Sequence, residues 1–300
     1  MDFGKVAVLM GGQAAEREVS LNSGRAVTQA LAAQGIDATA VDVTSLHDLV
    51  DVAKQYDRAF IALHGRWGED GVVQAILDDL KLPYTGSGMA ASAIAMDKLR
   101  TKWMWLGAGL STPRFIWVSK KTPLNLAEFS IPFPVIVKPS HEGSSIGMRK
   151  VNDLSALEEA VAYAQEFDSE VLIEQWITGR EYTGAILNGE ALPLIELKTA
   201  NEFYDFEAKY CSNETQYLCP CDLEGALQSS LKTMVLNAFN VIGAQGWGRV
   251  DFMLDEQNRP WLIELNTVPG MTDHSLVPMA AKATGRSFEA LVVEVLQSID

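Results

Sequence analysis

The chain has 300 residues, of which 48% are hydrophobic, enough to bury a substantial core and to predict two or three subdomains. Its formal net charge of −15 is the opposite of the balance found in proteins that grip nucleic acid by its phosphates, so we expect no nucleic-acid partner. The three cysteines, Cys211, Cys219 and Cys221, give no disulfide framework in a chain of this length, and we interpret them as free thiols.

The N-terminus leads directly into a short apolar run at residues 6–10. That run is too short for the hydrophobic region of a signal peptide, and no basic leader precedes it. No apolar run approaches the roughly 18 residues that are needed to span a bilayer. We therefore expect a cytoplasmic protein that has no membrane partner.

Short β-branched runs alternate with helical patterns over the first part of the chain. The runs predict buried strands at residues 6–10, 38–43 and 58–63, and the helical patterns lie at 20–34, 45–54 and 72–80. This alternation predicts a parallel sheet of the doubly wound type, which collects ligands at the carboxyl ends of its strands.

Two polar loops fall at the strand ends of this first unit. Residues 11–20 follow the first strand and carry Glu16, and residues 64–71 follow the third strand and begin with His64. Taken alone, His64 fits a structural histidine better than a ligand-binding one. Beside Glu16 at a neighbouring strand end, the two interpretations are equally good, so both residues are candidates for substrate contacts.

A G-x-G-x-x-A match at residues 86–91 leads into a predicted helix at 90–99. As a dinucleotide-binding fingerprint this match is weak, because it lies far from the first strand and no acidic residue ends a following strand about 20 positions later. A turn into the helix is sufficient to explain the glycines. The helix carries a cation, Lys98, near its end.

The second unit begins with a helical stretch at residues 102–106 and a strand at 113–118. Its clearest feature is a strand at 134–137 that ends in Lys138 and is followed by a loop rich in glycine and serine. Small residues let backbone N–H groups approach an anion, hydroxyls add donors, and the lysine supplies charge. The chain has no Walker A loop. We nevertheless predict phosphate binding, because a flexible linker does not explain a lysine at the end of a buried strand.

An amphipathic helix is predicted at residues 153–167, followed by a buried strand at 171–173. That strand ends in the polar stretch 174–181. Its backbone can meet a planar base while Glu181 accepts hydrogen bonds from ribose hydroxyls, although a plain strand-to-turn transition explains the pattern equally well.

Residues 200–222 show no clear periodicity and form the longest irregular stretch of the chain. A long irregular loop in a compact protein is usually functional, and Lys209 and Tyr210 are its candidate chemistry. A helical pattern follows at residues 227–242, and another at 287–299 closes the chain.

Two apolar runs at residues 250–254 and 261–265 flank the polar turn 255–260, which predicts a hairpin. Side chains on a strand alternate between its two faces. The residues expected on one shared polar face are Arg249, Asp251 and Met253 from the first strand and Leu262, Glu264 and Asn266 from the second.

If these polar faces coincide, two carboxylates and an amide oxygen converge, and such oxygen ligands suit Mg²⁺. A solvated face with a stray ion pair is the other interpretation. The predicted phosphate loop favours the metal site, because phosphates supply the remaining ligands that Mg²⁺ usually takes.

With these pieces in order, the chain resembles the D-alanine–D-alanine ligases of the ATP-grasp superfamily. The motifs that carry the resemblance lie at residues 12–20, 64–66 with 68–71, 138–140 with 143–145, 204–210, 248–251 and 264–272. A non-catalytic nucleotide sensor and an NAD-dependent oxidoreductase based on residues 86–91 fit these motifs less well.

The resemblance implies an α/β protein with an ATP-grasp fold. Its parts would be an N-terminal, Rossmann-like parallel-sheet domain at residues 1–97 and two α+β units, at 98–182 and 183–300, that sandwich ATP. The last unit would carry the metal site and a mobile loop at 200–222. A homodimer through the N-terminal unit is also implied.

The implied activity is the ATP-dependent ligation of two D-alanine molecules through a D-alanyl phosphate, for peptidoglycan precursor synthesis. The alternative is another ATP-grasp carboxylate–amine ligase, or one that makes D-alanyl-D-lactate. Tyr210 favours an amine acceptor, because ligases that use D-lactate typically depart from tyrosine there. Trp67 stands where members of the family often carry a small residue, and it could narrow the first substrate pocket or pack on the surface.

The resemblance also implies roles for individual residues. Those implied to bind ATP are Lys98, Lys138, Ser145, Glu174, Trp176, Ile177, Glu181 and Lys209. Those implied to bind two Mg²⁺ ions, with Mn²⁺ as a possible substitute, are Asp251, Glu264 and Asn266. Those implied to contact the two D-alanines are Glu16, His64, Ser275 and Leu276. The implied catalytic residues are Glu16, Ser144, Tyr210, Arg249 and Gly270, of which Glu16, Ser144 and Tyr210 would form a hydrogen-bonded triad that closes the loop over the site.

Overall fold

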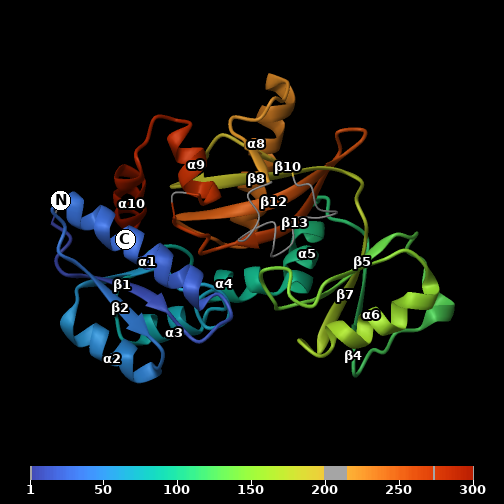
Figure 1. Ribbon diagram of the computed structural model, residues 1–300, viewed down its shortest axis with the longest axis horizontal. Coiled ribbons are helices and arrows are strands. Elements are labelled where there is room, and N and C mark those ends of the chain that lie inside the picture. The colour runs from blue at the N-terminus through green and yellow to red at the C-terminus, as the bar shows by residue number, and fades with distance from the viewer. Residues whose placement is uncertain (1, 199–214, 273, 300) are drawn as a thin grey trace.

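The computed structural model describes residues 2–198, 215–272 and 274–299. This part of the chain forms three β-sheets with helices packed on them, arranged as an elongated molecule with the N-terminal sheet at one end (Figure 1). Among the described residues, no helix is both long and apolar enough to cross a membrane.

The N-terminal sheet is parallel, as the strand–helix alternation predicts. Its strands are ordered β2-β1-β3, and they are β1 (Val6–Gly11), β2 (Ala38–Val43) and β3 (Arg58–Ile61). The helices of this unit are α1 (Arg17–Ala33), α2 (Leu46–Gln55) and α3 (Val72–Asp79). A capping box between Ser45 and Asp48 starts α2, since each side chain accepts a hydrogen bond from the other residue's backbone N–H.

The chain returns to this unit at its C-terminus, so the two ends of the chain lie at the same end of the molecule (Figure 1). Helices α9 (Leu276–Lys282) and α10 (Phe288–Gln297) share one hydrophobic core with the N-terminal sheet. The hydrophobic core of the N-terminal unit is therefore built from both ends of the sequence.

The prediction of a single helix at residues 90–99 is wrong. Two helices are present, α4 (Met89–Met96) and α5 (Lys98–Gly107), and they are separated by Asp97. Asp97 has an extended backbone (φ −88°, ψ 95°), and its carboxylate accepts a hydrogen bond from the backbone N–H of Arg100. An aspartate that caps a new helix competes with continuing the old one, and the break places Lys98 at the first position of α5.

The central sheet is antiparallel and has the strand order β4-β7-β5-β6. Its strands are β4 (Phe115–Ser119), β5 (Val135–Pro139), β6 (Arg149–Val151) and β7 (Glu170–Gln175). The predicted helix at 153–167 is shorter in the structure, where the 3₁₀ turn η2 (Leu154–Ala156) leads into α6 (Leu157–Ala164). A second 3₁₀ turn, η1 (Leu126–Glu128), lies in the segment that joins β4 to β5.

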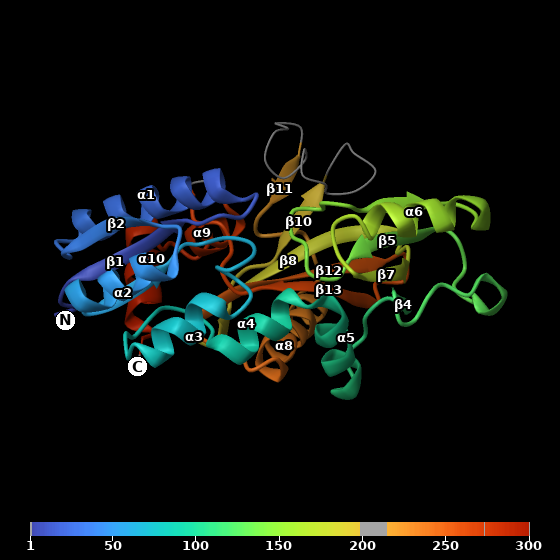
Figure 2. The same cartoon turned by 90° about the horizontal axis from the view of Figure 1, so that it is seen from below.

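The third and largest sheet is six-stranded, with the order β11-β10-β8-β12-β13 and β9 paired to β8. Its strands are β8 (Gly179–Leu187), β9 (Glu190–Ala191), β10 (Ile195–Lys198), β11 (Gln216–Leu218), β12 (Trp247–Asp255) and β13 (Pro260–Asn266). Helices α4, α5 and α8 (Gly225–Val241) cover one face of this sheet, as the view from below shows (Figure 2). Its other face packs against α9 and the core of the N-terminal unit at one end and is open toward the central sheet at the other.

The hairpin of β12 and β13 contains an irregularity that alternation alone does not predict. Asp251 pairs with Glu264, but the next residue, Phe252, pairs with Leu262, so Ile263 is an extra residue in β13. Leu262 is therefore buried in the core beside Phe252, and the prediction that it shares a face with Glu264 is wrong. Ile263 lies on the open face with Glu264 instead.

The core under the large sheet depends on aromatic packing of β12. Phe252 is fully buried and stacks on Tyr182, with ring centroids 5.6 Å apart. We expect Phe252→Ala to lower the free energy of unfolding by about 3–5 kcal/mol, because it leaves a cavity in a packed core. Urea denaturation followed by circular dichroism measures this. Leu46→Ala, at a leucine that is 57% exposed, is the control and should change stability by less than about 0.5 kcal/mol. Equal effects of the two variants would contradict the assigned core.

Candidate active site

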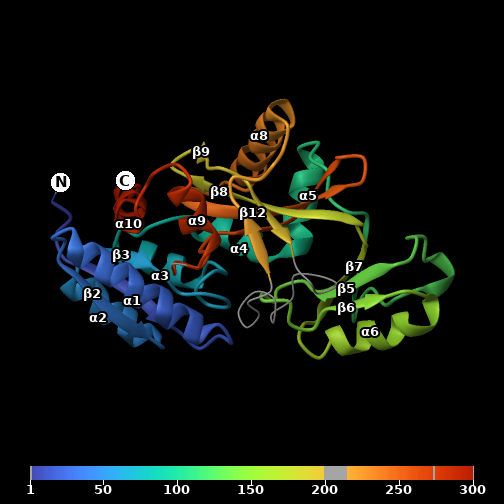
Figure 3. The same cartoon turned by 45° about the horizontal axis from the view of Figure 1, so that its top comes forward.

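Two cavities lie side by side where the three sheets meet. The larger has a volume of about 940 Å³ and opens between the central sheet and the open face of the large sheet, two layers that stand apart in Figure 3. Its size suits a nucleotide-sized ligand. The residues implied to bind ATP that line it are Lys98, Lys138, Ser145, Glu174, Trp176, Ile177 and Glu181.

The smaller cavity, of about 390 Å³, lies between the large sheet and the loops of the N-terminal sheet. The predicted substrate and catalytic residues that line it are Glu16, His64, Ser144, Arg249, Gly270, Ser275 and Leu276. The two cavities share Lys98, Gly143 and Glu264 in their walls. The two cavities are therefore direct neighbours, and these residues contact both of them.

The loop after β5 separates the two cavities. Ser144 and Ser145 both have positive φ values, 53° and 61°, which serine rarely adopts. Such conformations cost about 1–3 kcal/mol each and persist where the surroundings enforce them, which is typical of ligand-binding loops. One constraint is visible: the Ser144 hydroxyl donates a hydrogen bond to Glu16 Oε1 at 3.0 Å.

Glu16 is buried where the N-terminal and central units touch. Two glycines allow this close approach. A Cβ on Gly65 would lie 2.3 Å from Glu16 Oε2, and one on Gly143 would lie 2.9 Å from Oε1. Any larger residue at either position would displace the carboxylate, which explains the glycines in both motifs. Two of the three residues of the predicted triad, Glu16 and Ser144, are thus hydrogen-bonded to each other. The third, Tyr210, lies outside the described residues, as does Lys209.

The cations of the larger cavity are held by carboxylates and carbonyls. Lys98 Nζ donates to the backbone carbonyl of Glu142 at 2.6 Å and lies 3.9 Å from Glu264 Oε2. Lys138 Nζ lies 2.8 Å from Glu174 Oε2. Burial alone would raise the pKa of Glu174, but the attraction of Lys102 and Lys138 outweighs it, and the pKa is lowered. Glu174 is therefore ionised at neutral pH.

Asp251 lies at the centre of the open face of the large sheet. Arg249 binds both of its carboxylate oxygens, with Nε at 2.8 Å and Nη2 at 2.6 Å, and the Thr183 hydroxyl donates at 2.5 Å. The amide nitrogen of Asn266 also donates to it, at 3.1 Å, which directs the Asn266 amide oxygen away from Asp251. Glu264 is its direct cross-strand neighbour. The three predicted metal ligands are therefore brought together.

His64 is buried and both ring nitrogens are engaged. Its Nδ1 lies 2.8 Å from the carbonyl oxygen of Val268, and its Nε2 lies 3.0 Å from the Ser23 hydroxyl, which in turn accepts from the backbone N–H of Met271. Burial lowers the pKa of His64 to about 4, so the ring is neutral at physiological pH. A neutral ring donates from Nδ1 and accepts at Nε2, and so it fixes the backbone on both sides of Gly270.

Comparison with known proteins decides the family. Models described as the N-terminus and the C-terminus of D-ala D-ala ligase match residues 47–87 and 104–297. The chain is 68% identical to the D-alanine–D-alanine ligase of Hydrogenovibrio crunogenus, over 98% of this chain and 94% of that protein. It is 57% identical to the one of Alcanivorax borkumensis, over 98% and 93%.

A solved structure agrees with the sequence comparison. The crystal structure of the Bacillus anthracis D-alanine–D-alanine ligase complexed with ATP has a TM-score of 0.89 at 33% identity, covering 98% of this chain and 97% of that one. This chain belongs to the D-alanine–D-alanine ligase family. The ATP-grasp fold expected from the motifs is thereby confirmed.

Three residues that the structure places at the site of this ligase-family chain were not predicted from its sequence: Glu69, Thr183 and Lys102. Glu69 lines the smaller cavity, and burial raises its pKa to about 8. Thr183 lies on β8, a strand that no sequence pattern predicted. Lys102 lies behind Glu174, with no exposed surface. Of these residues, only Glu69 could have been found from the sequence, because it belongs to the loop motif at residues 68–71.

Contacts also explain two further residues of the sequence analysis, Ser275 and Trp67. The Ser275 hydroxyl accepts from the backbone N–H of Thr272 at 2.9 Å, which shapes the turn before α9 and the wall of the smaller cavity. Trp67 packs against the core of the N-terminal unit, and this favours the packing interpretation over a narrowed pocket.

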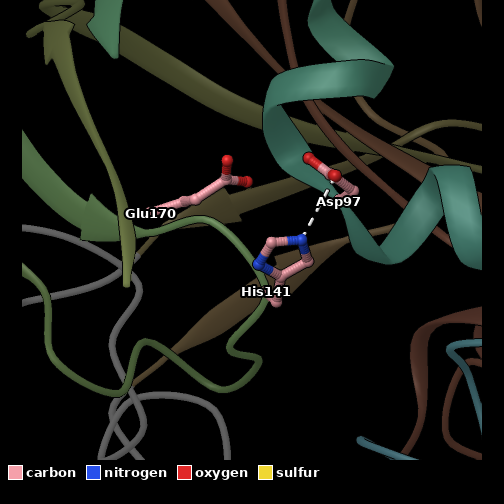
Figure 4. A group of neighbouring side chains, drawn as sticks. All are labelled: Asp97, His141 and Glu170. Atoms are coloured by element: carbon pink, nitrogen blue, oxygen red, sulfur yellow. Dashed lines mark ion pairs between the residues drawn. The ribbon is translucent and has the colours of Figure 1, made fainter. Parts of the chain in front are cut away.

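One further group, Asp97, His141 and Glu170, has the composition of a metal site (Figure 4). It is instead an ion-pair network. His141 bridges Asp97 at 3.2 Å and Asp168 at 2.7 Å, and these two carboxylates raise its pKa to about 9. Arg100 pairs with both Asp97 and Glu170. His141 and Arg100 therefore already pair with all three carboxylates, and the network anchors the start of the Ser144 loop.

The His64 network makes a stability prediction. The unfolded chain, with a histidine pKa near 6.5, binds a proton between pH 6.5 and 4 that the folded protein excludes, so acid destabilises the fold. We expect wild type to lose about 3 kcal/mol more than His64→Gln between these pH values. Urea unfolding at both pH values measures the difference. Glu69, whose pKa is raised, makes the opposite contribution to the pH dependence of stability, and comparing wild type with His64→Gln cancels it because both proteins contain Glu69. Equal losses of stability in the two proteins would show that His64 is not held neutral.

Proposed function

We propose that the chain joins two D-alanine molecules into D-alanyl-D-alanine at the expense of ATP. The observation that carries this proposal is that the two cavities adjoin each other and share Lys98 and Glu264 in their walls. The larger cavity has the cations that a triphosphate requires, and the smaller has an anion, Glu16, and a cation, Arg249, for an amino acid. Phosphoryl transfer between the two ligands is the chemistry that this arrangement allows.

ATP occupies the larger cavity in this proposal. Lys98, Lys138 and Ser145 surround its phosphates, together with Lys209 from the segment outside the described residues. Glu174 and the backbone at Trp176 and Ile177 hold adenine, and Glu181 accepts from the ribose. The support is that each of these residues that the structure describes lines one cavity.

The donor set of the large sheet fits Mg²⁺. Two carboxylates and an amide, Asp251, Glu264 and Asn266, lie on adjacent strands, and the side chain of Glu264 is 23% exposed in the walls of both cavities. These residues would hold two Mg²⁺ ions, or Mn²⁺. Bound there, the metal neutralises charge on the transferred phosphoryl group. Thr183 and Asn266 orient the Asp251 carboxylate for this role.

The first D-alanine lies with its ammonium on Glu16. Its carboxylate oxygen attacks the γ-phosphorus, ADP leaves, and D-alanyl phosphate forms. Ser144, held on Glu16, ties the loop of the larger cavity to this substrate, so loop and substrate are positioned together. The triad with Tyr210 closes the site and keeps water from the acyl phosphate.

The amine of the second D-alanine then attacks the acyl carbon, and phosphate leaves with the former carboxylate oxygen. Arg249 and the backbone N–H of Gly270 stabilise the tetrahedral oxyanion. Ser275 and the backbone N–H of Leu276 bind the second carboxylate. His64 supports Gly270 from behind through Val268 and Met271, so its role is to position the oxyanion donor.

A ligase with another acceptor, such as D-lactate, is the second candidate. Substrate profiling separates the two, since only the amine acceptor gives a dipeptide. Tyr210 favours the amine. The domain limits, the homodimer, the cytoplasmic location and the place in peptidoglycan synthesis stay predictions.

Phosphate release tests the proposal. With ATP and Mg²⁺, we expect release that depends on D-alanine and not on L-alanine. Asp251→Asn should reduce turnover by at least on the order of 100-fold, because it removes a charge that holds the metal. Asp255→Asn is the matched control on the same strand, in the turn and paired with Arg259, and should stay within about twofold. Phosphate release without D-alanine dependence in the wild type, or normal turnover of Asp251→Asn, would contradict the proposal.

A further inference from the structure

Lys102 is a fully buried lysine on α5 that no step of the proposed reaction uses. Its side chain has no exposed surface, whereas lysine is almost never fully buried unless it is paired. Its Nζ lies 2.9 Å from Glu174 Oε1 and donates to the Thr112 hydroxyl at 2.5 Å. A charge held this deeply needs an explanation, because a methionine of similar size would avoid the desolvation cost.

Glu174 lies between two lysines. One of its oxygens meets Lys102, and the other meets Lys138 Nζ at 2.8 Å. Glu174 and Lys138 line the larger cavity, and each is at most 2% exposed. The three groups carry charges of +1, −1 and +1, which sum to +1. Without Lys102, Lys138 and Glu174 would form a neutral pair, and the field of Lys138 toward a phosphate would be largely cancelled.

The contacts of Lys102 also reach the metal-bearing strand. Thr112, which accepts from Lys102, donates to the carbonyl oxygen of Leu262 at 2.8 Å. Leu262 directly precedes the extra residue Ile263 and the predicted metal ligand Glu264. Lys102 is therefore fixed against the central sheet through Glu174 and against the large sheet through Thr112, so its charge cannot move away from Glu174.

We propose that Lys102 is a positioning residue that occupies one oxygen of Glu174. The group of Lys102, Glu174 and Lys138 then keeps a net positive charge, which Lys138 presents to the phosphates of the nucleotide. This inference rests on the proposed ATP site and adds a residue to it that does not touch the nucleotide. Lys102 acts through Glu174 and Lys138, and its contribution depends on the number of phosphates in the ligand.

The test compares ligands that differ only in their phosphates. Adenosine, ADP and ATP are titrated calorimetrically into the full-length protein and into Lys102→Met. We expect the affinity for ATP to fall about tenfold, that for ADP less, and that for adenosine by less than about twofold. Equal losses for adenosine and ATP would mean that Lys102 only supports the local packing, and would overturn the proposal.

A double-mutant cycle shows whether Lys102 acts through Glu174. In a Glu174→Gln background, Lys138 is no longer neutralised by a carboxylate, so adding Lys102→Met should weaken ATP binding by less than about twofold further. If Lys102→Met weakened ATP binding by the same factor in the wild type and in the Glu174→Gln background, Lys102 would not act through Glu174. Lys102→Gln serves as the second charge-removing variant if the methionine variant does not fold, with the same selective loss of ATP expected.

Trp105→Phe is the control for damage to the helix. Trp105 is fully buried on α5, and its indole N–H donates to the carbonyl of Ala238, so the variant loosens the same helix without removing a charge. Trp105→Phe should weaken the binding of adenosine and of ATP by the same factor. A wild type that binds neither nucleotide would refute the proposed function itself, whereas a wild type that binds ATP normally beside a non-selective Lys102→Met would refute only the role of Lys102.

Discussion

The pairing of β12 with β13 is the constraint on which the whole site depends. It sets Asp251 directly opposite Glu264, and its one extra residue, Ile263, returns Leu262 to the core while Glu264 stays on the open face. The same two strands pass from the core of the large sheet to the walls of both cavities, so packing behind the sheet decides the positions of the ligands in front of it. A carboxylate aimed by a sheet with a buried face is held more rigidly than one on a loop, which suits a metal site.

Electrostatics explains how a chain with a net charge of −15 can bind a polyphosphate. Three cations that line the two adjoining cavities are each held in place by an acid or a carbonyl: Lys98 by Glu142, Lys138 by Glu174 and Arg249 by Asp251. Such pairs are costly to bury, and they are pre-organised, since the donors need no rearrangement when charge develops on a substrate.

The sequence was informative where a pattern repeats locally. The strand–helix alternation, the lysine at the end of β5 and the hairpin with its polar face follow from periodicity and residue type, and they located most of the site. The features that it missed depend on tertiary contacts. The break at Asp97 needs a capping hydrogen bond, the bulge at Ile263 needs the core behind the sheet, and the burial of Lys102 needs three elements that lie far apart in the chain. Strand β8 lacked a clean alternation because most of it is buried on both faces.

The central claim is that the carboxylate of one D-alanine meets the γ-phosphate of ATP where the two cavities join at Lys98 and Glu264. Transfer of oxygen isotope tests it most directly. With D-alanine labelled with ¹⁸O in its carboxylate, the attack and the later departure of phosphate must move one labelled oxygen from the amino acid into each inorganic phosphate released, as mass spectrometry can measure. Phosphate that carries no label, while dipeptide still forms, would contradict the account.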